Sequence, residues 1–145
     1  MLTTKELEIY IRKELNTSIY KDELIKDLNH FYVFSEDIVL NKFGPFSFVY
    51  ADSKGYRKIG VGDRGDYHKD NNIIYNLYDI CFEIFWDISF RLSTPPYYIV
   101  NDFVGDWRRW SFKKRLEILS SIDKKYEESG RQIINVILHE NPYTD

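Results

Sequence analysis

The sequence contains few of the residues that build covalent or metal sites. Its one cysteine, Cys81, lies in an apolar stretch, so no disulfide can form within the chain and a reducing compartment is favoured. The three histidines are His30, His68 and His139, and none of them has the spacing of a metal-binding pair. We therefore predict that the protein holds no metal and no cofactor and has no catalytic residues.

Long uncharged stretches are missing as well. No segment runs for about 18 residues without a charged side chain, which is the length that a membrane-spanning helix needs. Residues 1–6 lack the basic start and the apolar core of a signal peptide. These features predict a protein that stays in the cytoplasm and does not enter a membrane.

The composition is that of a packed domain. Hydrophobic residues make up 43% of the chain and aromatic residues 17%, which is too much for a disordered segment. A length of 145 residues predicts one domain over 1–145. The net charge of −3 argues mildly against general affinity for nucleic acid and makes a basic partner the easier match.

Two helices are expected near the N-terminus. Thr3 and Glu6 have the spacing of a capping box, in which each side chain binds the backbone N–H of the other residue. The first helix should therefore start at Thr4 and end before the Asn16-Thr17-Ser18 break. A second, short helix is expected over residues 21–29, where apolar residues recur at helical spacing.

A small sheet is expected to follow. Residues 37–43, 46–51 and 56–61 are rich in residues that favour strands, and the polar segment 52–55 has the glycine content of a hairpin turn. Together they predict an antiparallel meander of about three strands.

Residues 60–65 match the pattern G-x-G-x-x-G, which in nucleotide-binding proteins brings backbone N–H groups onto phosphates. Asp63 and Asp66 would repel phosphate, and the next expected helix starts several residues too late. We interpret this run as a turn.

Helical patterns dominate the C-terminal half. Residues 72–91 predict a long, apolar and central helix. Asp106 is placed to cap a helix that reaches about Ile122, and a last helix is expected over 124–140, before Pro142. The predicted fold class is α+β, with the small meander packed against four to five helices and a C-terminal half that is all helical.

Three carboxylates lie on one face of the long helix, because Asp79, Glu83 and Asp87 follow one another at intervals of four residues. A solvated helix face is the usual meaning of such a line. The alternative is a small enzyme in which neighbouring carboxylates perturb one another's pKa and serve as acid and base.

A basic and aromatic cluster occupies residues 107–115 and could stack bases and neutralise phosphates in a nucleic-acid-binding module. Arg109, however, shares a helical stripe with apolar residues such as Leu116, so we expect it to be partly buried. A buried arginine needs a carboxylate, for which Glu83 or Asp79 is the expected partner.

Residues 106–119 resemble the core motif D-x-R-R-x-x-F-x-K-Q-x-x-L-L of immunity protein family sixty-three of bacterial polymorphic toxin systems. Arg115 stands in place of the glutamine and Ile118 in place of a leucine. The ending, residues 141–145, is similar to the short Pro-Tyr-acidic tail of that family. The resemblance covers roughly residues 45–145, and the earlier part of the chain adds little to it.

The resemblance implies an immunity protein that binds a cognate toxin domain stoichiometrically and blocks it in the producing cell, with no enzymatic step. The motif residues that we expect to shape the fold are Asp106, Arg108, Arg109, Phe112, Leu116 and Leu119. The residues that we expect to face the toxin are Asp79, Glu83, Asp87, Tyr97, Tyr98 and Trp110. A nucleic-acid-binding module is the second hypothesis and a small enzyme the third.

Overall fold

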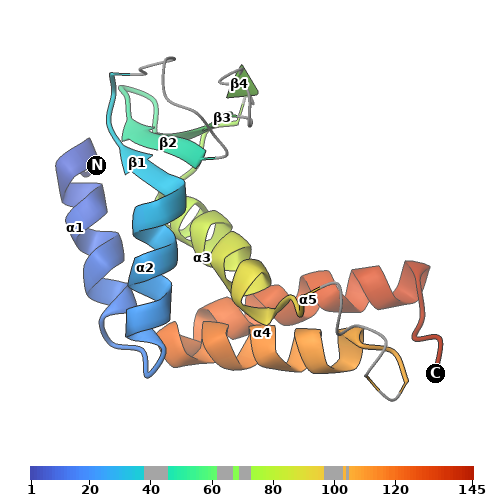
Figure 1. The fold of residues 1–145 in the computed structure, drawn as a ribbon. Coiled ribbons are helices and arrows are strands. Elements are labelled where there is room, and N and C mark those ends of the chain that lie inside the picture. The colour runs from blue at the N-terminus through green and yellow to red at the C-terminus, as the bar shows by residue number, and fades with distance from the viewer. Residues whose placement is uncertain (38–45, 62–66, 69–72, 97–102, 104) are drawn as a thin grey trace.

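The computed structural model describes residues 1–37, 46–61, 67–68, 73–96, 103 and 105–145. The elements, in chain order, are α1 (Thr4–Leu15), α2 (Lys21–Phe31), β1 (Tyr32–Phe34), β2 (Phe46–Ala51), β3 (Tyr56–Val61), β4 (Tyr67–His68), α3 (Leu77–Ser93), α4 (Arg108–Ile122) and α5 (Lys124–Glu140). The α+β class and the helical C-terminal half are confirmed. In Figure 1 the sheet lies at one end of the molecule, α4 and α5 lie at the other, and α3 runs between them.

The sheet has the strand order β1-β2-β3-β4 and is mixed. β2 and β3 form the predicted antiparallel hairpin, in which Phe48 pairs with Ile59, and β4 continues it antiparallel to β3. β1 differs from a pure meander because it extends directly from α2 and pairs parallel to β2, with Val33 opposite Phe48. The strand expected over 37–43 lies outside the described residues except for Asp37, which belongs to no strand.

The turn between β2 and β3 is built as the sequence predicts. The Asp52 side chain accepts hydrogen bonds from the backbone N–H groups of Lys54 and Gly55, which satisfies donors that the turn leaves unpaired. The first two residues of the turn expected at 60–65 belong to β3, and residues 62–65 lie outside the described residues.

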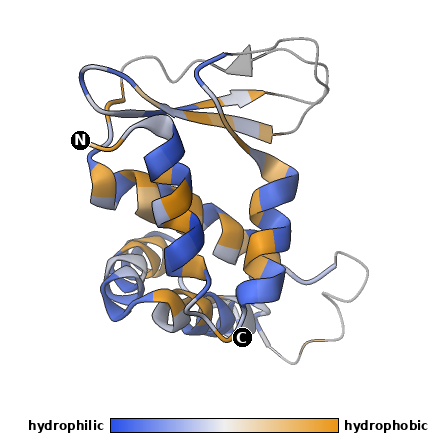
Figure 2. Cartoon of the chain, turned by 90° about the vertical axis from the view of Figure 1, so that its left-hand side faces the viewer, coloured by the Kyte–Doolittle hydropathy of each residue, from blue (hydrophilic) through white to orange (hydrophobic). Residues whose placement is uncertain are grey.

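Alternating side chains give the sheet two apolar faces. One face contributes Val49 and Tyr56 to the main core, which also contains fully buried residues of the helices. The other face carries a second cluster made of Phe48, Ile59 and Val61. Figure 2 shows the helices together on one side of the sheet, with their apolar faces turned inward.

α3 occupies the centre of the main core, where its stripe Ile80, Ile84 and Ile88 is completely buried. It packs against α2, α4, α5 and β3, as its wide apolar surface predicts. No helix of the described chain is long and apolar enough to span a membrane.

Side-chain caps mark the starts of α1, α3 and α5. The Thr3–Glu6 capping box is present, so α1 starts at Thr4 as predicted. α5 has the predicted bounds. α3, in contrast, begins five residues later than the expected position 72, because Tyr75 forms a β-bridge with Tyr56 and the Asn76 side chain caps the helix.

Candidate functional site

Two of the three carboxylates in the line on α3 form ion pairs with a lysine of the sheet. Lys58 of β3 places its Nζ 2.8 Å from Glu83 Oε1 and 2.9 Å from Asp87 Oδ2. Asp79, at the start of the line, is exposed. Burial opposes the charge on Lys58, but Asp87 and Glu83 outweigh that effect, so the pKa of Lys58 is raised above its ordinary value.

The same helix face continues to Arg91, four residues beyond Asp87. Arg91 holds the buried Asp27 of α2 through two hydrogen bonds, with Nε 2.9 Å from Oδ2 and Nη2 2.8 Å from Oδ1. Its Nη2 also donates to the Tyr32 hydroxyl over 3.0 Å. Burial raises the pKa of Tyr32 to about 12, so this hydroxyl stays neutral at physiological pH.

These charged residues form two sets of ion pairs on one face of α3, here named together the α3 polar seam: Lys58 joins the helix to the sheet, and Arg91 joins it to α2. The seam consists of Asp27, Lys58, Glu83, Asp87 and Arg91. Lys58 was not among the residues predicted from the sequence. The alternation of β3 could have identified it, because Lys58 lies on the same face as the core residue Tyr56 and a lysine on that face needs a carboxylate partner.

The expected burial of Arg109 against Glu83 or Asp79 is wrong. Arg109 is exposed, and its Nε lies 2.7 Å from Asp145 Oδ2, while its guanidinium lies 4.1 Å from the centre of the Tyr143 ring. The physical reason is the helix register, which turns Arg109 toward the C-terminal tail and away from α3.

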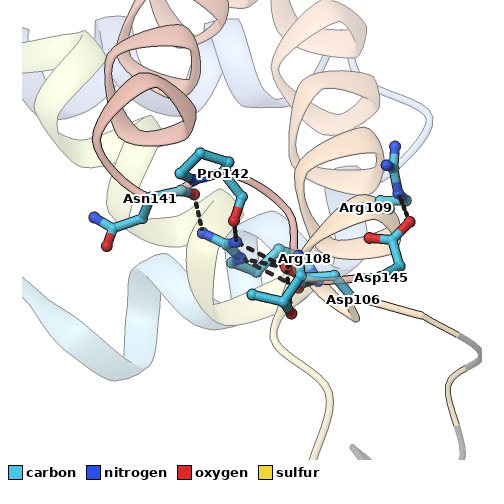
Figure 3. A network of polar contacts seen from close by, with 7 residues as sticks. Asp106, Arg108, Arg109, Asn141, Pro142 and Asp145 are labelled. Carbon is cyan, nitrogen blue, oxygen red and sulfur yellow. Dashed lines mark hydrogen bonds and ion pairs between the residues drawn. The ribbon is translucent and has the colours of Figure 1, made fainter.

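The start of α4 is tied to the tail (Figure 3). Asp106 and Arg108 form an ion pair with Oδ2 and Nη2 2.7 Å apart, and the same arginine donates to the carbonyl oxygens of Asn141 and Pro142 at 2.9 Å. The backbone N–H of Thr144 donates to Asp106 Oδ2 over 3.1 Å. Hydrogen bonds from Arg108 hold the pKa of Asp106 well below its usual range.

The two segments that resemble the immunity family therefore contact each other. Asp106 does not occupy the capping position itself, which is Trp107, but its carboxylate accepts from the backbone N–H of Arg108 over 3.0 Å. Leu119 is fully buried in the core.

Two further motif residues, Phe112 and Leu116, line an open groove between α4 and α5 with a volume of about 760 Å³. Ile134 and Leu138 of α5 line the same groove. Its charged lining residues are Arg109, Lys113, Glu117, Glu127 and Arg131.

Arg115 is the arginine that the fold buries. It is 6% exposed and stacks on Trp86 of α3, with the guanidinium carbon 3.2 Å from the ring centre and 5.1 Å from the centre of the Phe90 ring. Its Nε donates to Ser89 Oγ over 3.2 Å and its Nη2 to the Trp86 carbonyl over 2.7 Å.

Within the described part of the chain, no carboxylate forms an ion pair with Arg115. Burial lowers the pKa of this guanidinium to about 9, so it still carries its charge at neutral pH. Arg115 was predicted to belong to the basic cluster. The stripe of α4 that the fold buries consists of Ser111, Arg115, Ile118, Leu119 and Ile122, and helical spacing alone does not distinguish it from the stripe that contains Arg109.

The basic cluster 107–115 does not form one surface. Arg108 and Arg109 are paired with Asp106 and Asp145, and Arg115 faces α3. Lys114 donates to the Tyr20 hydroxyl over 3.1 Å and lies over that ring.

The remaining candidates are scattered. Trp110 is 43% exposed and lies beside Phe103, with the ring centres 5.7 Å apart. Tyr97 and Tyr98 lie outside the described residues. Cys81 is completely buried, and burial raises the pKa of its thiol to about 12. Among the described residues no group of three side chains could hold a metal ion.

Comparison with models of known protein families, with curated proteins and with solved structures finds no match. The function is therefore inferred from the residues and their geometry.

Proposed function

We propose that this protein is an immunity protein, which neutralises a cognate bacterial toxin domain by direct stoichiometric binding in the cytoplasm of the producing cell. The observation that carries the proposal is Arg115, a buried cation without a carboxylate partner in the described structure, next to Phe90, which is 48% exposed. The resemblance of residues 106–119 to an immunity family supplies the kind of partner.

The buried charge of Arg115 lowers the stability of the protein when no partner is bound. A buried charge that lacks a counter-ion destabilises a fold by several kcal/mol, on the order of the whole net stability of a small domain. Residues that lower the stability of a fold are concentrated at functional sites. Arginine and tryptophan are also the residues most enriched among those that dominate binding energy in protein interfaces. A protein-binding surface over Arg115, Trp86 and Phe90 accounts for the buried charge of Arg115, for the presence of an arginine and a tryptophan side by side, and for the exposed ring of Phe90.

The charge distribution supports fast association with a basic toxin. In the α3 polar seam, Glu83 and Asp87 share only Lys58, so two carboxylates and one ammonium leave one net negative charge. Exposed Asp79 extends this region, and the whole chain carries a net charge of −3. Such a field raises the rate of encounter more than the final affinity.

The geometry favours this function over nucleic-acid binding. Nucleic-acid recognition by residues 107–115 needs several free cations on one face, whereas Arg108 and Arg109 are ion-paired and Arg115 is buried. Lys113 is the exposed cation of the cluster that has no partner among the described residues.

The proposal predicts that a toxin domain is encoded beside this protein's gene, and the test uses that domain. Co-expression is expected to restore the growth of cells that make the toxin, and the purified proteins are expected to form a 1:1 complex in size-exclusion chromatography with light scattering. Rescue should rise with the amount of protein and saturate at equal stoichiometry, since no turnover is involved. If the folded protein neither restores growth nor binds the toxin domain, the immunity proposal is wrong.

A further inference from the structure

We infer that Arg115 is the anchor of the toxin interface and that it receives a carboxylate, from an aspartate or glutamate side chain of the toxin, between Trp86 and Phe90. This inference rests on the proposed function and names the chemistry of the partner at its site. The Arg115 platform is defined here as Arg115, Trp86 and Phe90.

The guanidinium has a free edge for such a group. Its Nε and Nη2 donate to Ser89 and to the Trp86 carbonyl, whereas Nη1 has no hydrogen-bond partner among the described residues. No fully buried side-chain nitrogen or oxygen of the described residues lacks a partner, so Nη1 is not fully buried. Nη1 and the second N–H of Nη2 form a fork that matches the two oxygens of a carboxylate.

The rings around the guanidinium strengthen the binding of a carboxylate at this edge. Trp86 stacks on one side of the guanidinium and excludes water there, and Phe90 flanks it. The carboxylate that acts on Arg115 from within the chain is Asp87, and its Oδ2 is already held by Lys58 at 2.9 Å. A toxin carboxylate would therefore supply the counter-ion that the free protein does not, in surroundings where a charge-assisted hydrogen bond is strong.

The platform fits a protein side chain better than a small anion. Arg115 does not line the groove between α4 and α5, and its guanidinium lies between the rings of Trp86 and Phe90. Phe90 presents nearly half of its apolar surface beside the guanidinium, and covering it requires apolar atoms next to the carboxylate. A protein surface that carries an acidic residue among apolar ones provides both the carboxylate for Arg115 and the apolar atoms that cover Phe90.

The first arm of the experiment needs no partner. In the variant Arg115→Met the apolar volume is kept and the buried charge is removed. Ser89 Oγ donates to the Trp86 carbonyl over 2.8 Å in the native protein, so both groups keep a partner in the variant. Urea denaturation should give a midpoint equal to or higher than the native one. A clearly lower midpoint would mean that Arg115 serves the fold, and it would overturn the inference.

The second arm measures affinity for the toxin domain by titration calorimetry. Arg115→Met should weaken binding by about 30-fold or more, because truncating one member of a desolvated charge pair costs about 2 kcal/mol or more. Phe90→Ser should also weaken binding, and since Phe90 is half exposed this variant keeps its fold if Arg115→Met does not. Arg12→Met is the matched control: Arg12 is 37% exposed, pairs with Glu8 on α1, and should leave affinity unchanged.

The third arm identifies the carboxylate. Each aspartate and glutamate on the toxin surface is changed to the amide, and its effect is measured with the native protein and with Arg115→Met. One toxin residue should lose most of its effect in the Arg115→Met background, since the two side chains act as a pair. If no acidic residue is coupled to Arg115, the inferred partner chemistry is wrong.

The outcomes separate the two proposals. A native protein that does not bind the toxin domain refutes the immunity function and the anchor with it. A native protein that binds, together with an Arg115→Met variant that binds equally well, refutes only the anchor and directs attention to the groove between α4 and α5.

Discussion

Lys58 and Asp87, on β3 and α3, are joined by an ion pair of 2.9 Å between Nζ and Oδ2. The lysine side chain is 16% exposed and also holds Glu83, so one ammonium neutralises one of the two negative charges at the contact between sheet and helix. Two of the three carboxylates that the sequence predicts to face the toxin therefore take part in holding the sheet to α3. The third, Asp79, forms no ion pair with any of the described residues.

Removing Lys58 should therefore destabilise the fold. In Lys58→Met the carboxylates of Glu83 and Asp87 lose their shared cation and repel each other, at a cost of about 1–3 kcal/mol. Urea denaturation at neutral pH checks this. Lys54→Met is the matched control, because Lys54 lies exposed in the β2–β3 turn and should change stability by less than about 0.5 kcal/mol. Equal effects of the two substitutions would show that the seam contributes nothing.

The sequence predicts the elements whose signals are local. The capping box of Thr3 and Glu6 and the periodic pattern of residues 124–140 give the start of α1 and both ends of α5. It does not predict β1, because three residues after a helix carry no strand pattern and its parallel partner lies more than ten residues away. The start of α3 is decided by the bridge between Tyr75 and Tyr56, which outweighs the helical periodicity of residues 72–76.

The candidate site is harder to predict for a related reason. α4 carries charged residues on most of its circumference, so periodicity alone does not say whether Arg109 or Arg115 is buried. The choice depends on where α3 lies, which is a tertiary property. The sequence predicts where α4 lies, but the cation that this helix buries is Arg115 and not Arg109.

Gly130 marks a close approach of α5 to its neighbours. A Cβ atom there would lie 2.7 Å from Leu119 Cδ1 and 3.0 Å from Trp86 Cζ3. Glycine to alanine within a helix usually gains about 1 kcal/mol, but here the rigid indole and the fully buried leucine cannot yield. Gly130→Ala should therefore lower the free energy of unfolding by about 1–2 kcal/mol. Gln132→Ala, on the exposed side of α5, is the control and should be neutral. A stabilised Gly130→Ala variant would contradict the packing described.

Cys81 should make the stability depend on pH in the alkaline range. Burial raises the pKa of its thiol from 9.0 to about 12, so the unfolded chain loses the thiol proton first. The contribution of the neutral thiol is complete below pH 9 and is lost as the pH rises toward 12, with a slope of about 1.4 kcal/mol per pH unit.

The variant Cys81→Ala isolates this effect. It should be less stable than the native protein at pH 7 by about 1 kcal/mol, because a small cavity is left. Between pH 9 and 11 the difference should shrink and then reverse. Tyr32 and Lys58, whose pKa values are also raised, affect both proteins alike because Cys81 does not contribute to either shift. Denaturation curves whose difference stays constant over this range would show that the thiol ionises equally in both states.

The last prediction concerns Asp106 and the C-terminal tail. The pKa of Asp106 is held below its ordinary value of 3.8, first by hydrogen bonds from Arg108 and further by the Thr144 N–H. A lowered pKa means that the tail contact is fully present above pH 3.8 and is lost as the pH falls through the lower folded value. The amide resonance of Thr144 should therefore stay constant down to pH 3.8 and shift only below it, and a midpoint at or above 3.8 would refute the contact. In Asp106→Asn the Thr144 amide should exchange with solvent faster at neutral pH, whereas Asp145→Asn, which removes only the pair with Arg109, should leave that exchange nearly unchanged because the bond to Asp106 remains.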